Sequence, residues 1–143
     1  MDTHITFHGT SKENLLSILT NGFSSNFGKG YGSTFGKGIY STPCIKYASC
    51  YTETDKLLLC EIQSGLTLKL RKKEVLHRKN KNIKYDLLII DDCDEYLCSK
   101  TDNIKPIGIL IVNKKWNGDT LIDVEVVEKR LLGDQFSLDN ILL

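Results

Sequence analysis

The N-terminal part of the chain has the hydrophobic pattern of a strand followed by a capped helix. Thr3–Phe7 is predicted as a short strand, and Thr10–Glu13 has the form of a capping box. Apolar residues then recur at helical spacing. Gly22 stands where the glycine after a helix belongs, with Phe23 placed to close back on the helix. The predicted apolar stripe consists of Leu15, Leu16, Ile18 and Leu19.

A glycine-rich segment interrupts this pattern. Residues 27–38 contain five glycines and three aromatic residues and repeat Phe-Gly-Lys-Gly, so we expect a loop over residues 24–37. Loops of this length usually have a function or are disordered. The segment is not a phosphate-binding loop, because it lacks Gly-x-x-x-x-Gly-Lys-Ser/Thr and no strand leads into it. It is not a dinucleotide fingerprint, since that motif also requires a preceding strand.

The rest of the chain contains short apolar runs, most of them rich in strand-forming residues. Pro43–Tyr51 is predicted as a short helix, because proline is tolerated in a first turn. Asn117–Asp119 is a strong hairpin signal, and residues 131–143 are expected to form a short helix or a loose tail. The pattern predicts an α+β domain with few helices and mostly antiparallel strands. One predicted strand begins at Gly38–Tyr40. The other predicted strands are Leu57–Ile62, Leu66–Leu70, Leu87–Ile90, Ile104–Val112 and Leu121–Val127.

The bulk properties narrow the class of protein. A chain of 143 residues suits one domain, expected to span residues 1–143, with enough core to fold without a metal or disulfide. The formal net charge of +1 does not suggest an electrostatic nucleic-acid binder. The basic stretches 69–73 and 78–81 are interpreted as a solvated loop, although they leave a nucleic-acid partner open.

The expected compartment is the cytoplasm, with the nucleus as an alternative. The start of the chain lacks a secretory signal pattern, and no apolar run is long enough for a membrane helix. Five cysteines occur without a Cys-x-x-Cys motif, so free thiols in a reducing compartment and no metal site are expected.

Three ordered segments, taken together, resemble the catalytic domain of the poly(ADP-ribose) polymerase family in its broad sense. The resemblance covers roughly residues 3–112 and implies two packed, mostly antiparallel sheets with few short helices. It also includes an aromatic residue eleven positions after Tyr40. The segments are Phe7–Thr10 with the helix ending at Gly22, then Gly36–Tyr40 with Ala48 and Tyr51, then Asp94–Leu97 with Asn103–Pro106.

The resemblance implies a role for each matched residue. His8, Tyr40 and Glu95 would form the catalytic triad, with His8 bonding the adenosine-side ribose of NAD⁺ and Glu95 the nicotinamide ribose. Gly9 would offer its backbone to the nicotinamide carboxamide, and Thr10 would serve both the helix cap and NAD⁺. Tyr40 and Tyr51 would enclose the nicotinamide ring.

The same residue types suit the chemistry. Breaking the bond between nicotinamide and ribose builds positive charge on the sugar, as in glycoside cleavage. The leaving nicotinamide is neutral, so one fixed carboxylate and well-positioned neighbours suffice, without a metal. Glu95 lies in an acidic run that could instead be a solvated loop, and Glu125 and Glu128 are the fallback carboxylates.

Two departures from the family pattern define the alternatives. Ala48 replaces a serine that usually bonds the nicotinamide carboxamide, with Ser49 as its candidate substitute, and Ser41 replaces an aromatic residue. The leading hypothesis is a monomeric mono-ADP-ribosyltransferase that uses NAD⁺ and modifies a protein or, less expected, a nucleic acid. The departures favour a second hypothesis, a module that binds NAD⁺ or ADP-ribose without catalysis. RNA 2′-phosphotransfer is a third, disfavoured because the three arginines lie away from the motifs.

Overall fold

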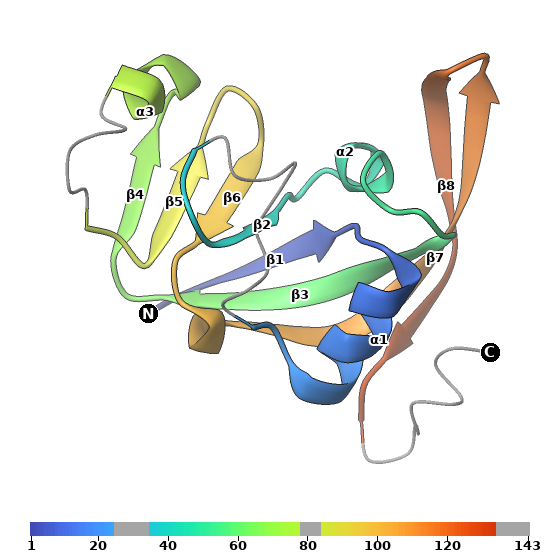
Figure 1. Ribbon diagram of the computed structural model, residues 1–143, viewed down its shortest axis with the longest axis horizontal. Coiled ribbons are helices and arrows are strands. Elements are labelled where there is room, and N and C mark those ends of the chain that lie inside the picture. Colours follow the sequence, from blue (N-terminus) through green and yellow to red (C-terminus); the bar gives the residue numbers. More distant parts are fainter. Residues whose placement is uncertain (25–34, 78–83, 134–143) are drawn as a thin grey trace.

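The computed structural model describes residues 1–24, 35–77 and 84–133 (Figure 1). Two four-stranded sheets carry the fold, with strand orders β1-β3-β7-β8 and β2-β6-β5-β4. The first sheet comprises β1 (Asp2–His8), β3 (Lys56–Ser64), β7 (Ile104–Asn117) and β8 (Thr120–Leu131). The second comprises β2 (Ile39–Ser41), β4 (Thr67–Leu70), β5 (Leu87–Ile90) and β6 (Glu95–Cys98). The helices are α1 (Lys12–Asn21), α2 (Ile45–Ser49), α3 (Lys72–His77) and a 3₁₀ turn at Thr101–Asn103.

The predicted α+β architecture is confirmed. Every pairing in the first sheet is antiparallel, and β4–β5 is the one parallel pair among the strand pairs of the described residues. Gly65 carries the chain from β3 in the first sheet to β4 in the second. Buried side chains of both sheets belong to one core cluster, so the two sheets are packed against each other.

The main core lies between the two sheets and under α1. Leu15 and Ile18 of α1 are buried there, as the helical stripe predicts. Each fully buried aliphatic side chain of this kind contributes about 1.5–3 kcal/mol. The core residues from the first sheet are Leu58, Cys60, Ile62, Ile104 and Ile109, and those from the second sheet are Ile39, Leu87, Ile89 and Cys98.

The ends of α1 confirm one sequence prediction and correct another. Gly22 adopts a φ of 79° and its amide donates to the Ile18 carbonyl, as expected after a helix. The N-cap, however, is Ser11, whose side chain accepts from the Asn14 amide at 3.2 Å. The prediction that Thr10 caps the helix is therefore wrong by one residue, because an equally suitable hydroxyl follows it.

The basic segment around residues 69–73 is not a loop. It contains the end of β4 and the start of α3, so the solvated-loop interpretation is wrong for this part. The sequence did not predict α3, because a helix with one buried residue, Val75, among charged residues shows no apolar stripe. The whole second basic stretch, residues 25–34 of the predicted loop and residues 134–143 of the predicted tail lie outside the described residues, while Leu131 belongs to β8.

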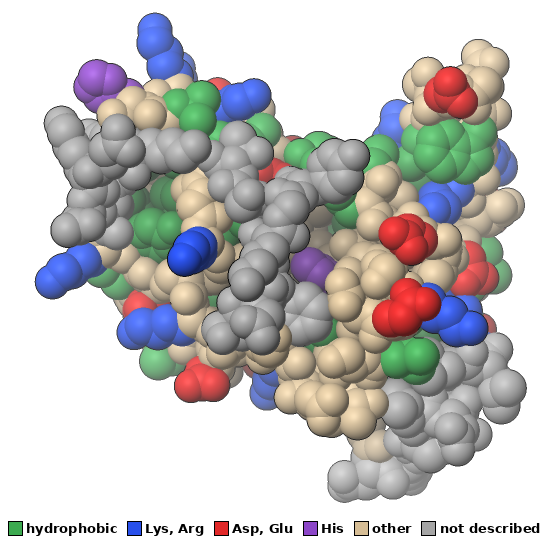
Figure 2. Space-filling view, viewed as in Figure 1, with side chains coloured by type: hydrophobic (Ala, Val, Ile, Leu, Met, Phe, Trp, Pro, Cys, Tyr) green, Lys and Arg blue, Asp and Glu red, His purple; other side chains and the backbone are tan. Residues whose placement is uncertain are grey.

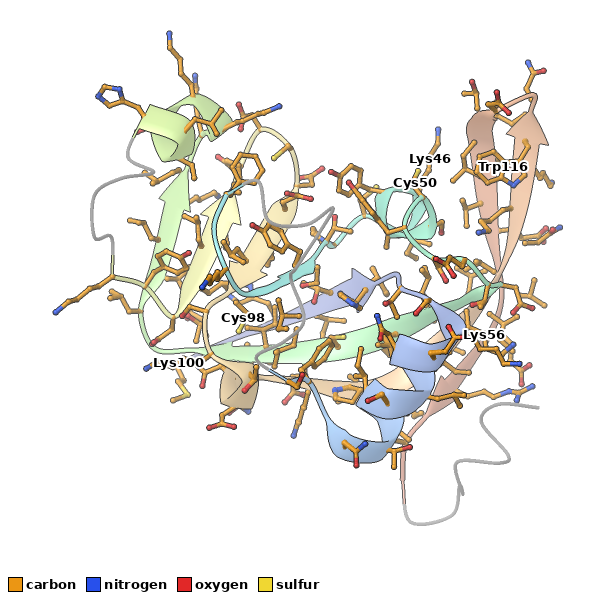
Figure 3. All side chains as sticks on the ribbon, viewed as in Figure 1. Lys46, Cys50, Lys56, Cys98, Lys100 and Trp116 are labelled. Carbon is orange, nitrogen blue, oxygen red and sulfur yellow. The ribbon has the colours of Figure 1, made fainter. Side chains whose placement is uncertain are left out.

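The β7–β8 hairpin turns at Gly118, which has a φ of 61°, as the Asn-Gly signal predicts. Both strands are longer than predicted, because polar residues continue the pairing beyond the apolar runs. The distal part of the hairpin, which carries Trp116, stands away from the rest of the molecule (Figures 1, 2 and 3).

Candidate active site

The ends of β1 and β2 meet at the junction of the two sheets. The Phe7 amide donates to the Thr42 carbonyl at 2.8 Å, and the Thr42 amide donates back to Phe7 at 3.0 Å. Next to this bridge, Nδ1 of His8 lies 2.5 Å from the Tyr40 carbonyl oxygen. His8 and Tyr40 therefore sit beside each other although they are far apart in sequence.

β6 brings Glu95 to the same junction. Tyr40 pairs with Leu97 and Ser41 with Tyr96, so one further step of this antiparallel register sets Glu95 opposite Thr42. The preceding residue, Asp94, has a φ of 50°, a left-handed conformation that aspartate tolerates better than most residues. The turn ending there points Glu95 into β6, and the structure thus gathers His8, Tyr40 and Glu95.

Glu95 lies in an environment that opposes its negative charge. Its side chain is half-buried, and desolvation raises the pKa of its carboxyl group. A hydrogen bond donated by the Tyr47 hydroxyl at 3.1 Å and the positive charge of Lys72 oppose that shift. A carboxylate held this way interacts strongly with any positive charge that develops beside it.

The hydrogen bond of His8 fixes its tautomer. A carbonyl oxygen can only accept, so Nδ1 carries the proton that is donated to Tyr40, and Nε2 is left as an acceptor. Burial lowers the pKa of His8, which favours this neutral ring. The ring also meets Phe23 edge-on, with centroids 5.3 Å apart. His8 is therefore an oriented hydrogen-bond acceptor.

The Tyr40 side chain anchors the described end of the glycine-rich segment 27–38. Its hydroxyl donates to the Gly36 carbonyl at 2.5 Å and accepts from the Phe35 amide at 3.1 Å. Burial raises the pKa of Tyr40 to about 12, and the nearby charge of Glu95 contributes. The phenol therefore stays protonated, and its ring is fixed at both ends.

Gly9 and Thr10 lock the end of β1 against the segment that follows α2. A Cβ at Gly9 would lie 2.3 Å from the Ala48 carbonyl oxygen and 2.8 Å from the Thr52 amide, so no other residue fits. The Thr10 carbonyl accepts from the Glu53 amide at 3.2 Å and from the Thr52 hydroxyl at 3.3 Å. These contacts hold α2 directly beside the triad.

α2 places its two small residues inward. Ala48 is buried in a cluster with Leu57 and Leu110, and Ser49 is buried beside it. The Ser49 hydroxyl donates to the Ile45 carbonyl at 2.7 Å, inside the helix. Its predicted contact with nicotinamide stays a prediction, and would require the hydroxyl to rotate or to share its proton.

Tyr51 lies just beyond α2 and is 44% exposed. Its hydroxyl is 3.0 Å from that of Tyr47, and the two rings meet edge-on at 5.4 Å. Tyr47 also bonds Glu95, and sequence reasoning missed it. The available signal was its spacing of four from Tyr51, which puts both side chains on one helical face.

Comparison of the sequence with models of protein families identifies the family of the chain. The model of the poly(ADP-ribose) polymerase catalytic domain matches residues 1–92 of the 143-residue chain. The chain belongs to this family. The matched region runs from β1 through β5 and includes His8 and Tyr40, and it stops just before Glu95. No curated protein matches the chain.

The rest of this poly(ADP-ribose) polymerase-like domain bears on the fallback carboxylates. Glu125 and Glu128 lie on β8, the strand of the first sheet farthest from β1. Glu128 is paired with Arg130 at 2.9 Å, which lowers the pKa of its carboxyl. Glu95 is therefore the one of the three candidates that lies beside His8 and Tyr40.

Among the residues that the structure describes, no group of three or more His, Cys, Asp and Glu side chains is arranged to hold a metal ion. In the same residues, none of the helices combines the length and apolar character that crossing a membrane requires.

Proposed function

We propose that this domain is a mono-ADP-ribosyltransferase, which transfers ADP-ribose from NAD⁺ to an acceptor and releases nicotinamide. The observation that carries the proposal is the convergence of His8, Tyr40 and Glu95 from three separate strands at one junction. Family membership supports NAD⁺ as the substrate.

The geometry suggests how NAD⁺ is held. Nε2 of His8 accepts a hydrogen bond from a hydroxyl of the adenosine-side ribose, which requires the neutral tautomer described above. The Gly9 backbone and Thr10 approach the nicotinamide carboxamide. The rigid faces of Tyr40 and Tyr51 lie against the pyridine ring.

The chemical step needs one negative charge at the sugar. The bond between the anomeric carbon and the nicotinamide nitrogen breaks, and its electron pair neutralises the pyridinium. Glu95 holds the 2′-hydroxyl and stabilises the positive charge that develops on the ribose. The acceptor nucleophile then bonds the anomeric carbon and loses its proton.

The acceptor and its setting are part of the proposal. The segment between Leu70 and Leu87, where the family has the loop that shapes the acceptor site, is short and includes α3. A short segment there favours a single transfer over polymer growth. We expect a protein acceptor, with a nucleic acid as the second choice, and a monomeric, cytoplasmic or nuclear protein.

Labelled NAD⁺ provides the test. The purified chain is incubated with adenine-labelled NAD⁺ and cell lysate, and transferred label and released nicotinamide are measured. We expect both signals from the native chain. Glu95→Gln and His8→Ala should lose them while circular dichroism shows an intact fold. A folded native chain that gives neither signal would overturn the proposal.

Ala48 favours a second candidate, a module that binds NAD⁺ or ADP-ribose without turnover. The hydroxyl expected at this position is missing, and that of Ser49 is engaged within α2. Ligand at about 100 times its Kd should then add roughly 2.7 kcal/mol to the stability of the fold. A rise in melting temperature with NAD⁺, without nicotinamide release, would select this candidate.

A further inference from the structure

Glu95 receives a hydrogen bond from a residue outside the predicted triad. The Tyr47 hydroxyl on α2 lies 3.1 Å from Oε1 of Glu95 and 3.0 Å from the Tyr51 hydroxyl. An ionised carboxylate only accepts, so Tyr47 spends its single proton on Glu95. Tyr51 must then donate to Tyr47, and the order of the chain is Tyr51 to Tyr47 to Glu95.

We propose that Tyr47 is a positioning residue that orients Glu95 toward the ribose and links it to Tyr51. This inference rests on the proposed function. Tyr47 is not part of the predicted triad. Through it, the Tyr51 side chain and the Glu95 carboxylate belong to one hydrogen-bonded unit.

The contacts of α2 explain why Tyr47 can act this way. Gly9 approaches the backbone of Ala48, and Ala48 is itself buried in the core, so the helix is held in place directly after Tyr47. The Thr42 hydroxyl accepts from the Cys44 amide at 3.1 Å at the start of the helix. A phenol on such a helix has few free rotations, and the donated bond fixes one carboxylate oxygen.

The contact between Tyr47 and Tyr51 within one helical face does not account for the contact between Tyr47 and Glu95. Tyr47 and Tyr51 form an i, i+4 pair, which by itself stabilises a helix slightly. Glu95, however, is 48 residues away on the second sheet and is half-buried. Leaving a desolvated carboxylate without donors is costly, and here the hydroxyl of Tyr47 meets that need.

The test compares three Tyr→Phe variants of the full chain. Tyr47→Phe removes the donor to Glu95 and keeps the ring. It should lower kcat for nicotinamide release on the order of ten- to a hundredfold, with the Kd for NAD⁺ changed by less than about threefold. Tyr51→Phe keeps the hydrogen bond from Tyr47 to Glu95 and should lower kcat about two- to tenfold. Tyr96→Phe is the matched control next to Glu95, and its rate should equal that of the native chain.

A second measurement does not depend on turnover. The groups electrostatically coupled to Glu95 are Tyr47, Tyr40, Cys93 and Lys72. The bond from Tyr47 favours the ionised form, so in Tyr47→Phe the carboxyl signal of Glu95 in a carbon-13 NMR titration should move to higher pH. Tyr96→Phe should not move it.

The outcomes separate the two proposals. A folded native chain without nicotinamide release contradicts the proposed function, and the titration still tests the contact between Tyr47 and Glu95. An active native chain whose Tyr47→Phe variant keeps its kcat overturns the positioning role. An unchanged Glu95 titration in that variant overturns the hydrogen bond itself.

Discussion

The junction of the two sheets and the outer strand β8 each present a glutamate, in opposite environments. Glu95 at the junction is half-buried, accepts from a neutral phenol, and has a raised carboxyl pKa. Glu128 on β8 is exposed and paired with Arg130, which lowers its carboxyl pKa. Burying a carboxylate opposes its ionisation, and strongly perturbed carboxyl groups cluster at functional sites. The desolvated carboxylate therefore marks the candidate site.

The largest effect on the rate of nicotinamide release is expected when each of these glutamates is replaced by glutamine, its neutral isostere. Glu95→Gln should reduce nicotinamide release on the order of 10² to 10³-fold, because it removes the charge opposite the developing cation. Glu128→Gln should leave the rate unchanged. Parallel measurement of kcat for the two variants checks the contrast, and equal losses would contradict it.

The raised pKa of the Glu95 carboxyl also predicts a trend in stability. A raised folded pKa means that the fold favours the protonated form, so ionised Glu95 costs stability above its unfolded pKa. Glu95→Gln removes that cost and can still accept from Tyr47 through its amide oxygen. Its unfolding free energy at neutral pH should therefore equal or exceed that of the native chain in denaturant titration.

The next effect concerns the packing that holds α2 at the junction. Gly9→Ala puts a methyl group 2.3 Å from the Ala48 carbonyl oxygen, so the backbone must move. We expect a loss of about 1–3 kcal/mol in urea unfolding and weaker NAD⁺ binding. Gly133 has open space around its Cα, and Gly133→Ala should change stability by less than about 0.5 kcal/mol. A Gly9→Ala variant as stable as this control would show that the close approach is not required.

The lowered pKa of His8 predicts how the stability of the fold depends on pH. Its folded pKa lies below the unfolded value of 6.5, so the unfolded chain takes up this proton first. The stability that His8 contributes is therefore present above pH 6.5 and is lost as pH falls through the folded pKa. The slope from this group is at most about 1.4 kcal/mol per pH unit. His8→Gln should flatten the stability curve below pH 6.5, and parallel curves in that range would contradict the assignment.

The fold was predictable where local signals were strong. Gly22 and Asn117–Asp119 mark a helix end and a hairpin through backbone conformations that few residues favour. α3 escaped because charged residues surround its single buried valine. The full length of β7 and β8 escaped because the pairing continues through polar residues that face solvent.

The site was predictable as an ordered set of motifs, and less so as a set of contacts. His8 and Tyr40 stand in short, recognisable segments, so their proximity could be expected. The bond between Tyr47 and Glu95 depends on the register of β6 against β2 and on where α2 is packed. The residues around position 47 indicate neither the strand register nor the packing of the helix, so the contact could be found only from the structure.

The smallest expected effect restores the hydroxyl that the family usually has. Ala48→Ser should tighten nicotinamide binding about two- to tenfold, the value of one added hydrogen bond, if Ala48 lies beside the carboxamide. Ala48 is buried next to Gly9, so the new hydroxyl must bond the ligand or a carbonyl within α2. Ser49→Ala tests the other hydroxyl on α2, which donates to Ile45 in the free protein. Isothermal titration with nicotinamide checks both. If Ala48→Ser binds no tighter and Ser49→Ala binds more weakly, Ser49 rather than position 48 faces the ligand, and the carboxamide contact moves by one residue along α2.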